Sequence, residues 1–173
     1  MTGKTHAAVG VVSTAALIML YPKGFDVSGI RILPIVSLVT AVTGSYLPDI
    51  DIQRSALGQR HRIISRMLKH RGATHSLIVP LFIVVLIYAI SKYLAVLVPI
   101  AILLNSVLFG LLFGWVLHIF ADMFNKKGVP LLYPFTRSHF HIASVKTAHW
   151  SEGVWLMMYI ACVVGVAVMK GAL

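Results

Sequence analysis

Five apolar runs, separated by short polar connections, decide what this chain of 173 residues can fold into. The runs cover residues 7–21, 30–47, 77–90, 94–120 and 154–168. With 58% hydrophobic and only 12% charged residues, the chain holds more apolar sequence than the core of a soluble domain needs. A helix needs about 20 apolar residues to cross a bilayer, so each run is a candidate span. The sequence therefore predicts an all-α, polytopic transmembrane bundle of about five spans, built as one domain over residues 1–173.

The charge distribution predicts how the chain lies in the membrane. A net charge of +10 suits a nucleic-acid binder, but Lys and Arg also collect in the cytoplasmic loops of membrane proteins. If the N-terminus is inside, eleven Lys and Arg residues fall in inside segments and four in outside segments. We therefore expect an integral protein of a bacterial or archaeal cell membrane, with a cytoplasmic N-terminus, an outer C-terminus and no nucleic-acid partner. Small residues at 13–16 lie within the first run, which we expect to be a retained span and not a cleaved signal peptide.

The same topology brings ionisable residues from every span to one level, the cytoplasmic surface of the membrane. Each of them opens or closes an apolar run, and they include four of the five acidic residues of the chain. The set is His6, Asp49, Asp51, His70, His75, His118, Asp122 and Glu152. Histidines and carboxylates bind divalent metal ions, and an ionisable group at the edge of an apolar span is a functional candidate. We therefore predict a polar metal site at this surface.

His118 and Asp122 form the pair with the most informative spacing. Four residues apart on a helix, they project from one face and can bind one ion, although a histidine satisfied in the core has the same spacing. Their position near a span end favours the metal interpretation. His70 and His75 are five residues apart, on different sides of a regular helix. They converge only if Gly72 turns the chain, or they bind different ions.

The remaining candidates each have two interpretations. Asp49 and Asp51 point to the same side if their segment is extended, and then bind one ion or bridge two, but both also suit a turn. His6 alone fits an interfacial histidine as well as a ligand. Glu152 either caps the last apolar run near its N-terminus or belongs to the site. Arg71 either contacts a phosphate or is one of the cations that set the topology.

Residues 52–74 form the most basic connection of the chain. Within them, Ile63, Ile64, Met67 and Leu68 fall on one side of a helix. Such an amphipathic helix is expected to lie on an anionic membrane surface.

Four motifs together resemble the YdjM-like membrane-bound metal-dependent hydrolases over nearly the whole chain. They are residues 5–10 (THAAVG), 47–51 (LPDID), 70–76 (HRGATHS) and 118–122 (HIFAD), the last continuing through Gly128 to residues 131–135 (LLYPF). That family is grouped with the zinc-dependent phospholipases C and related single-strand nucleases, which are helical phosphoesterases with a cluster of metal ions. The resemblance implies a site built from His6, Asp49, His70, His75, His118 and Asp122.

The residue types and the resemblance together predict a metal-dependent hydrolase, a phosphoesterase acting on a phospholipid or polyprenyl phosphoester at the inner headgroup level. Two or three divalent ions, Zn²⁺ or else Mn²⁺, would activate water and neutralise charge on a phosphoryl oxygen. Asp49 or Glu152 would act as general base, and Arg71 would hold a phosphate oxygen. The alternative is a non-enzymatic membrane metal-binding protein, that is, a carrier, a sensor or a regulatory subunit. Carriers place ionisable residues near the midplane, whereas these residues lie at span ends.

Overall fold

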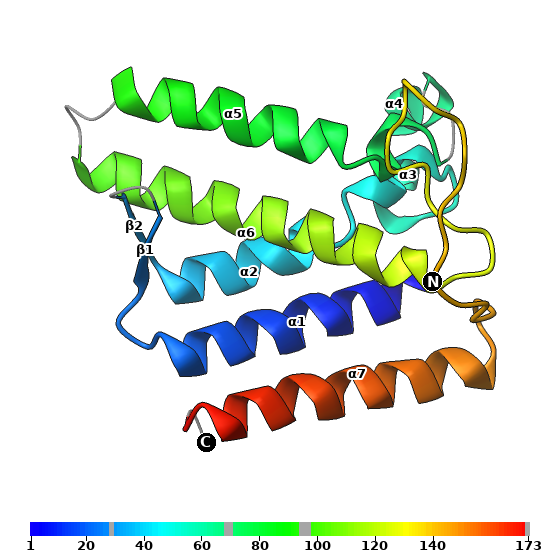
Figure 1. The fold of residues 1–173 in the computed structure, drawn as a ribbon. Helices are drawn as coiled ribbons and strands as arrows, with labels where there is room; N and C mark the ends of the chain where they lie inside the picture. Colours follow the sequence, from blue (N-terminus) through cyan, green and yellow to red (C-terminus); the bar gives the residue numbers. More distant parts are fainter. Residues whose placement is uncertain (28–29, 68–70, 94–97, 172–173) are drawn as a thin grey trace.

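Helices form nearly all of the regular structure, and the long ones run side by side along one axis in the computed structural model (Figure 1). The structure describes residues 1–27, 30–67, 71–93 and 98–171, so the predicted ligand His70 lies outside the described residues. The long helices are α1 (Gly3–Leu20), α2 (Pro34–Gly44), α5 (Ile78–Tyr93), α6 (Val98–Met123) and α7 (Trp150–Met169). Each of the five apolar runs therefore overlaps one of these helices.

Three of these helices, α1, α6 and α7, are long and apolar enough to cross a membrane among the residues that the structure describes. Helix α2 has 11 residues and α5 has 16, both short of the length that a perpendicular span needs. The prediction of a helix from residue 30 onward is wrong at its start. Residues 30–32 form strand β2 (Ile30–Ile32), which pairs antiparallel with β1 (Phe25–Val27), and α2 begins only at Pro34. Proline is favoured in the first helical turn, because an N–H at that position would have no partner within the helix and its absence costs little.

A small apolar core forms where Met1, Val9 and Ala121 pack together, while many other large apolar side chains cover the outside of the long helices. Leu81 and Phe82 on α5 are 63% and 67% exposed, and Met157 on α7 is 72% exposed. Such a surface is unfavourable in water but suits contact with lipid chains.

Helices α2 and α6 pack backbone against backbone. A Cβ atom added at Gly114 would lie 2.0 Å from the carbonyl oxygen of Ala41, and one added at Gly44 would lie 2.2 Å from that of Leu111. Only glycine fits at such distances, and small residues are typical of close helix pairs in membranes. This packing fixes the position of Ser45, the residue that follows α2, against α6.

Short helices gather at one end of the bundle (Figure 1). They are η1 (Pro48–Asp51), α3 (Ala56–Arg60), α4 (Arg62–Met67) and η2 (Ala73–His75). Helix α1 begins, α6 ends and α7 begins at the same end, beside the irregular segment of residues 124–149. In that segment Val129 and Phe140 exchange two backbone hydrogen bonds of 2.9 Å. The chain thus brings distant polar segments together at one end of the bundle.

Candidate metal centre

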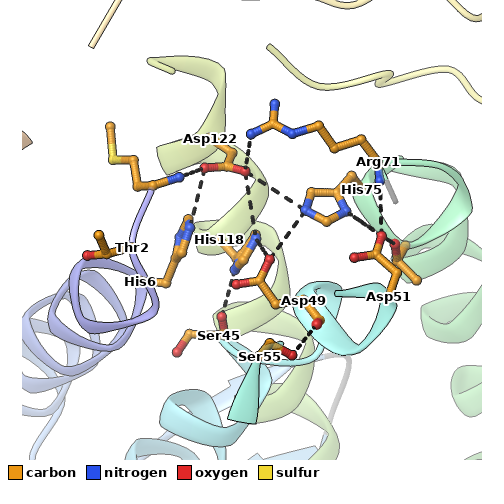
Figure 2. Close-up of polar contacts among 12 residues, drawn as sticks. Thr2, His6, Ser45, Asp49, Asp51, Ser55, Arg71, His75, His118 and Asp122 are labelled. Carbon is orange, nitrogen blue, oxygen red and sulfur yellow. Dashed lines mark hydrogen bonds and ion pairs between the residues drawn. The ribbon is translucent and has the colours of Figure 1, made fainter. Parts of the chain in front are cut away.

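Five predicted ligands meet at this end of the bundle (Figure 2). They form two overlapping groups, His6 with Asp49 and His118, and His75 with His118 and Asp122, with the ligand atoms of each group within 4.8 Å of one another. The three histidines and Asp122 are at most 2% exposed, and Asp49 is half-buried. Four separate elements supply them, namely α1, η1, η2 and α6.

His118 presents its Nε2 atom to this group. Its Nδ1 atom lies 2.7 Å from the carbonyl oxygen of Ser45, and because a carbonyl only accepts hydrogen bonds, Nδ1 carries the proton. Ser45 follows the last turn of α2, where carbonyl groups have no partner within the helix. Nε2 then keeps its lone pair, lies 3.6 Å from Oδ1 of Asp49 and has no hydrogen bond among the described residues. A metal-binding histidine has this arrangement, with one ring nitrogen held by the protein and the other facing the ion.

His75 is held in the same manner, but by a carboxylate. Its Nδ1 atom lies 3.3 Å from Oδ2 of Asp51, while its Nε2 atom lies 3.8 Å from Oδ1 of Asp49 and 3.9 Å from Oδ2 of Asp122. Asp51 also accepts hydrogen bonds from the hydroxyl of Thr74, at 2.6 Å, and from the backbone N–H of Arg71, at 3.0 Å. These contacts fix the ring of His75 with Nε2 directed into the group.

The two aspartates of the 47–51 motif therefore face different nitrogens of one histidine ring. Of the two interpretations of this motif, the one that placed both aspartates in an extended segment is wrong, because residues 48–51 form the 3-10 helix η1. A tight helical turn separates the two side chains, so Asp49 lies near Nε2 of His75 and Asp51 near Nδ1. Asp51 is thus placed to orient a ligand.

His6 stacks on His118, with ring centroids 3.6 Å apart and an angle of 14° between the rings. Its Nε2 atom lies 3.3 Å from Oδ1 of Asp122, and neither ring nitrogen has a hydrogen bond among the residues described. Burying an imidazole whose nitrogens make no hydrogen bond is unfavourable, and a bound cation would satisfy the lone pair of the ring. Three imidazoles and two carboxylates also form a donor set that suits Zn²⁺ or Mn²⁺. The residues present therefore fit a divalent metal ion.

The two carboxylates of the group differ in their charged neighbours. Burial raises the pKa of the Asp49 carboxyl above its ordinary value, and the nearby His6 and His75 oppose this increase. Asp122 contacts the amino group of Met1 and lies 3.2 Å from Nη2 of Arg71. Asp49 thus lacks a comparable cation among these contacts, and a divalent ion beside it would stabilise its charged form.

Arg71 connects three segments of the polar end. Its backbone is left-handed, with a φ of 57°, and its N–H donates to Asp51. Its guanidinium donates to the carbonyl of Gly128 and to Oδ2 of Asp122. The side chain is 10% exposed. These contacts show that Arg71 holds Asp51 and Asp122 in position. The predicted contact of Arg71 with a phosphate stays a prediction.

Glu152 lies in a hydrogen-bond network of its own. Its carboxylate accepts from the backbone N–H groups of Thr2 and Ala148, both at 2.6 Å, and from the hydroxyl of Thr5, at 2.5 Å. These bonds join the start of α1, the irregular segment of residues 124–149 and the first turn of α7. Because Thr5 precedes His6, Glu152 anchors the turn of α1 that carries a ligand. The bond from Ala148, just before α7, agrees with the capping interpretation.

Sequence reasoning missed the groups that orient the ligands. The carbonyls of Ser45 and Gly128 act through the backbone, which leaves no mark on residue type. The one available signal was Gly110 and Gly114, four residues apart in an apolar run, which indicates a close helix contact.

Exposed apolar helices and a buried His/Asp group define a helical membrane protein with a candidate metal centre. A family model described as YdjM inner membrane protein matches residues 1–173. The chain therefore belongs to the YdjM inner membrane protein family and is an integral membrane protein.

Two relatives illustrate how far the similarity extends. The chain is 30% identical over 156 residues to uncharacterized protein YvsG of Bacillus subtilis (strain 168), covering 88% of this chain and 85% of the relative. It is 38% identical over 100 residues to inner membrane protein YdjM of Escherichia coli (strain K12), covering 55% of this chain and 47% of that protein. No solved structure matches. Neither name assigns an activity.

Proposed function

We propose that the protein is a membrane-embedded metal-dependent hydrolase, a phosphoesterase acting on a phospholipid or polyprenyl phosphoester. The observation that carries the proposal is the convergence of three buried histidines and two carboxylates from four elements. Nε2 of His118 supports it further, because the atom is buried and directed at Asp49 without a hydrogen bond among the described residues.

Asp122 and Asp49 would hold the ions together with the three histidines. The Oδ1 atom of Asp122 lies 3.3 Å from Nε2 of His6, whereas its Oδ2 atom lies 3.9 Å from Nε2 of His75 and 4.0 Å from that of His118. Asp49 adds a second oxygen between His75 and His118, at 3.8 Å and 3.6 Å. One imidazole nitrogen binds one ion, so the two carboxylates would complete the set of ligands that the three histidines begin. Zn²⁺ is the first candidate and Mn²⁺ the second.

Bound divalent ions would supply an activated water and would neutralise charge on a phosphoryl oxygen. Asp49 is the carboxylate of the group most accessible to solvent, with 13% of its side chain exposed against 3% for Asp122, and we assign it the general base. Glu152 was the other candidate from the sequence, but its carboxylate already accepts three hydrogen bonds from elsewhere. Arg71 holds Asp122, and we assign it the contact with a phosphate oxygen of the substrate.

The position of the group suggests where the substrate lies. The candidate spans α1, α6 and α7 begin or end beside it, so the group is expected at the level of lipid headgroups (Figure 1). Exposed lysines and arginines are concentrated at this end, which favours the cytoplasmic side and hence a cytoplasmic N-terminus.

An assay with a panel of lipid phosphoesters tests the proposal directly. Purified protein is supplied with Zn²⁺ or Mn²⁺, and release of the water-soluble headgroup or of phosphate is measured beside a His118→Ala, Asp122→Ala double variant. Hydrolysis by the wild type and its loss in the variant would support the proposal. Full activity in the variant would rule it out.

A non-enzymatic metal-binding function is the second candidate. The observation in its favour is the deep burial of four of the five ligands, each at most 2% exposed, which suits a structural or sensing ion. Stoichiometric metal binding without hydrolysis of any lipid phosphoester would select this function.

A further inference from the structure

Helix α4 presents its apolar side away from the protein. Ile63 is 78% exposed and Met67 is 82% exposed, whereas Ser65 is only 3% exposed. At 3.6 residues per turn, Ser65 projects about 160° away from Ile63 and Met67. A helix on the surface of a soluble protein has the reverse pattern, with its apolar side against the core. This orientation favours an apolar surrounding on the outer side of α4.

Helix α4 lies at the end of the bundle where the candidate spans begin or end, which is where the boundary between lipid chains and headgroups is expected. It packs against η1, and η1 contacts α6. Figure 1 shows α4 at the end of the bundle where α1 begins, α6 ends and α7 begins. The candidate spans therefore leave the hydrocarbon layer close to α4.

The charge around α4 has one sign. Arg62 and Arg66 are exposed on the helix itself, and Arg60 is exposed on the neighbouring α3. The chain has five acidic residues, and four of them are buried or half-buried in the polar end. The fifth, Asp26, lies on β1 at the opposite end (Figure 1). Among the described residues, no exposed carboxylate therefore lies near these cations, and their complement is an anionic partner.

We propose that α4 is an interfacial helix that docks on anionic phospholipid headgroups of the bilayer that the protein spans. Ile63 and Met67 enter the boundary with the acyl chains, and Arg62 and Arg66 contact the lipid phosphates, because basic amphipathic helices bind membranes through both contributions. A nucleic acid or an acidic peptide would match the arginines but would give the exposed Ile63 and Met67 no apolar partner. The proposal rests on exposure and charge, and it holds whether or not the metal group catalyses hydrolysis.

Site-specific fluorescence measures the depth of α4. The full-length chain carries Cys162→Ser and one new cysteine, Ile63→Cys, Met67→Cys or, as control on exposed α3, Gln59→Cys. Each variant is labelled with an environment-sensitive dye and reconstituted in bilayers of phosphatidylcholine and phosphatidylglycerol. We expect spin-labelled lipid to quench residues 63 and 67 at least about threefold more strongly than residue 59, with iodide quenching in the reverse order. Strong iodide quenching at 63 and 67 without quenching by lipid would overturn the proposal.

A second experiment isolates the charge contribution. Native mass spectrometry counts retained phosphatidylglycerol for the wild type, for an Arg62→Gln, Arg66→Gln variant and for a Lys23→Gln, Lys170→Gln control with the same change in charge at other exposed sites. We expect retained lipid to fall in the first variant and to stay at the wild-type value in the control. Equal retention in all three proteins would overturn the phosphate contacts. Shielding of residue 63 from iodide by an oligonucleotide or polyglutamate in detergent, with no effect of phosphatidylglycerol, would assign the surface to a soluble polyanion instead.

Discussion

The two ends of the bundle use the same residue types in opposite ways. At the polar end, Asp122 is 2% exposed and lies 3.2 Å from the guanidinium of Arg71. At the other end, Asp26 and Arg31 face each other across the β1–β2 pair, and both are exposed. Water screens the exposed pair, whereas removing one member of the buried pair leaves a charge without compensation. Burial and convergence, more than the presence of ionisable residues, distinguish the end that carries the candidate metal centre.

The largest effect is expected from Asp122→Asn. Arg71 and the histidines would lose the carboxylate that they share, which costs about 3–5 kcal/mol of unfolding free energy in the metal-free protein. Affinity for Zn²⁺ should fall by more than about 100-fold, because a ligand is lost. Chemical unfolding and competition with a fluorescent chelator measure the two quantities. Unchanged zinc affinity would show that Asp122 is not a ligand.

Gly114→Leu should come second, because it separates the elements that form the polar end. Its side chain would meet the carbonyl of Ala41 and the backbone N–H of Ser45, forcing α2 away from α6. A loss of about 1–3 kcal/mol or more is expected, together with weaker metal binding as Ser45 leaves His118. Thermal unfolding in detergent measures the effect. The matched control is Gly165→Leu, since nothing lies within 4 Å of a Cβ there, and equal destabilisation by both variants would contradict the account.

Asp51→Asn should have an intermediate effect. The amide still accepts a hydrogen bond from Thr74 but no longer supplies a charge beside Nδ1 of His75. Zinc affinity should fall by about 10–100-fold with little change in stoichiometry, as is usual for groups that orient metal ligands. Isothermal titration calorimetry separates these values. Loss of a whole ion would show instead that Asp51 is a ligand.

Asp26→Asn should have the smallest effect and sets the scale for the others. An exposed cross-strand pair contributes under about 1 kcal/mol, so stability should change within this range. Zinc affinity should stay within about twofold, because Asp26 lies at the opposite end of the bundle (Figure 1). A large loss of zinc affinity in this variant would mean that the two ends are coupled, against the comparison drawn above.

The sequence predicted the convergence of His6, Asp49, His75, His118 and Asp122, because alternating spans bring alternate connections to one end of a bundle. It did not predict that α2 begins only at Pro34, since an apolar run looks the same whether it is all helix or begins with a paired strand. It also did not separate Asp49 from Asp51, because their directions depend on the 3-10 turn of η1. The carbonyl of Ser45, which fixes the proton of His118, is a backbone group that every residue has.

Metal content tests the central claim most directly. The wild-type protein and His118→Ala are purified in detergent without chelator, dialysed against Zn²⁺ or Mn²⁺ and then against metal-free buffer, and their ions are counted by inductively coupled plasma mass spectrometry. Circular dichroism confirms that the variant keeps its helices. The account predicts two ions per wild-type chain and loss of at least one in the variant. A folded wild-type protein that retains no divalent metal would contradict it.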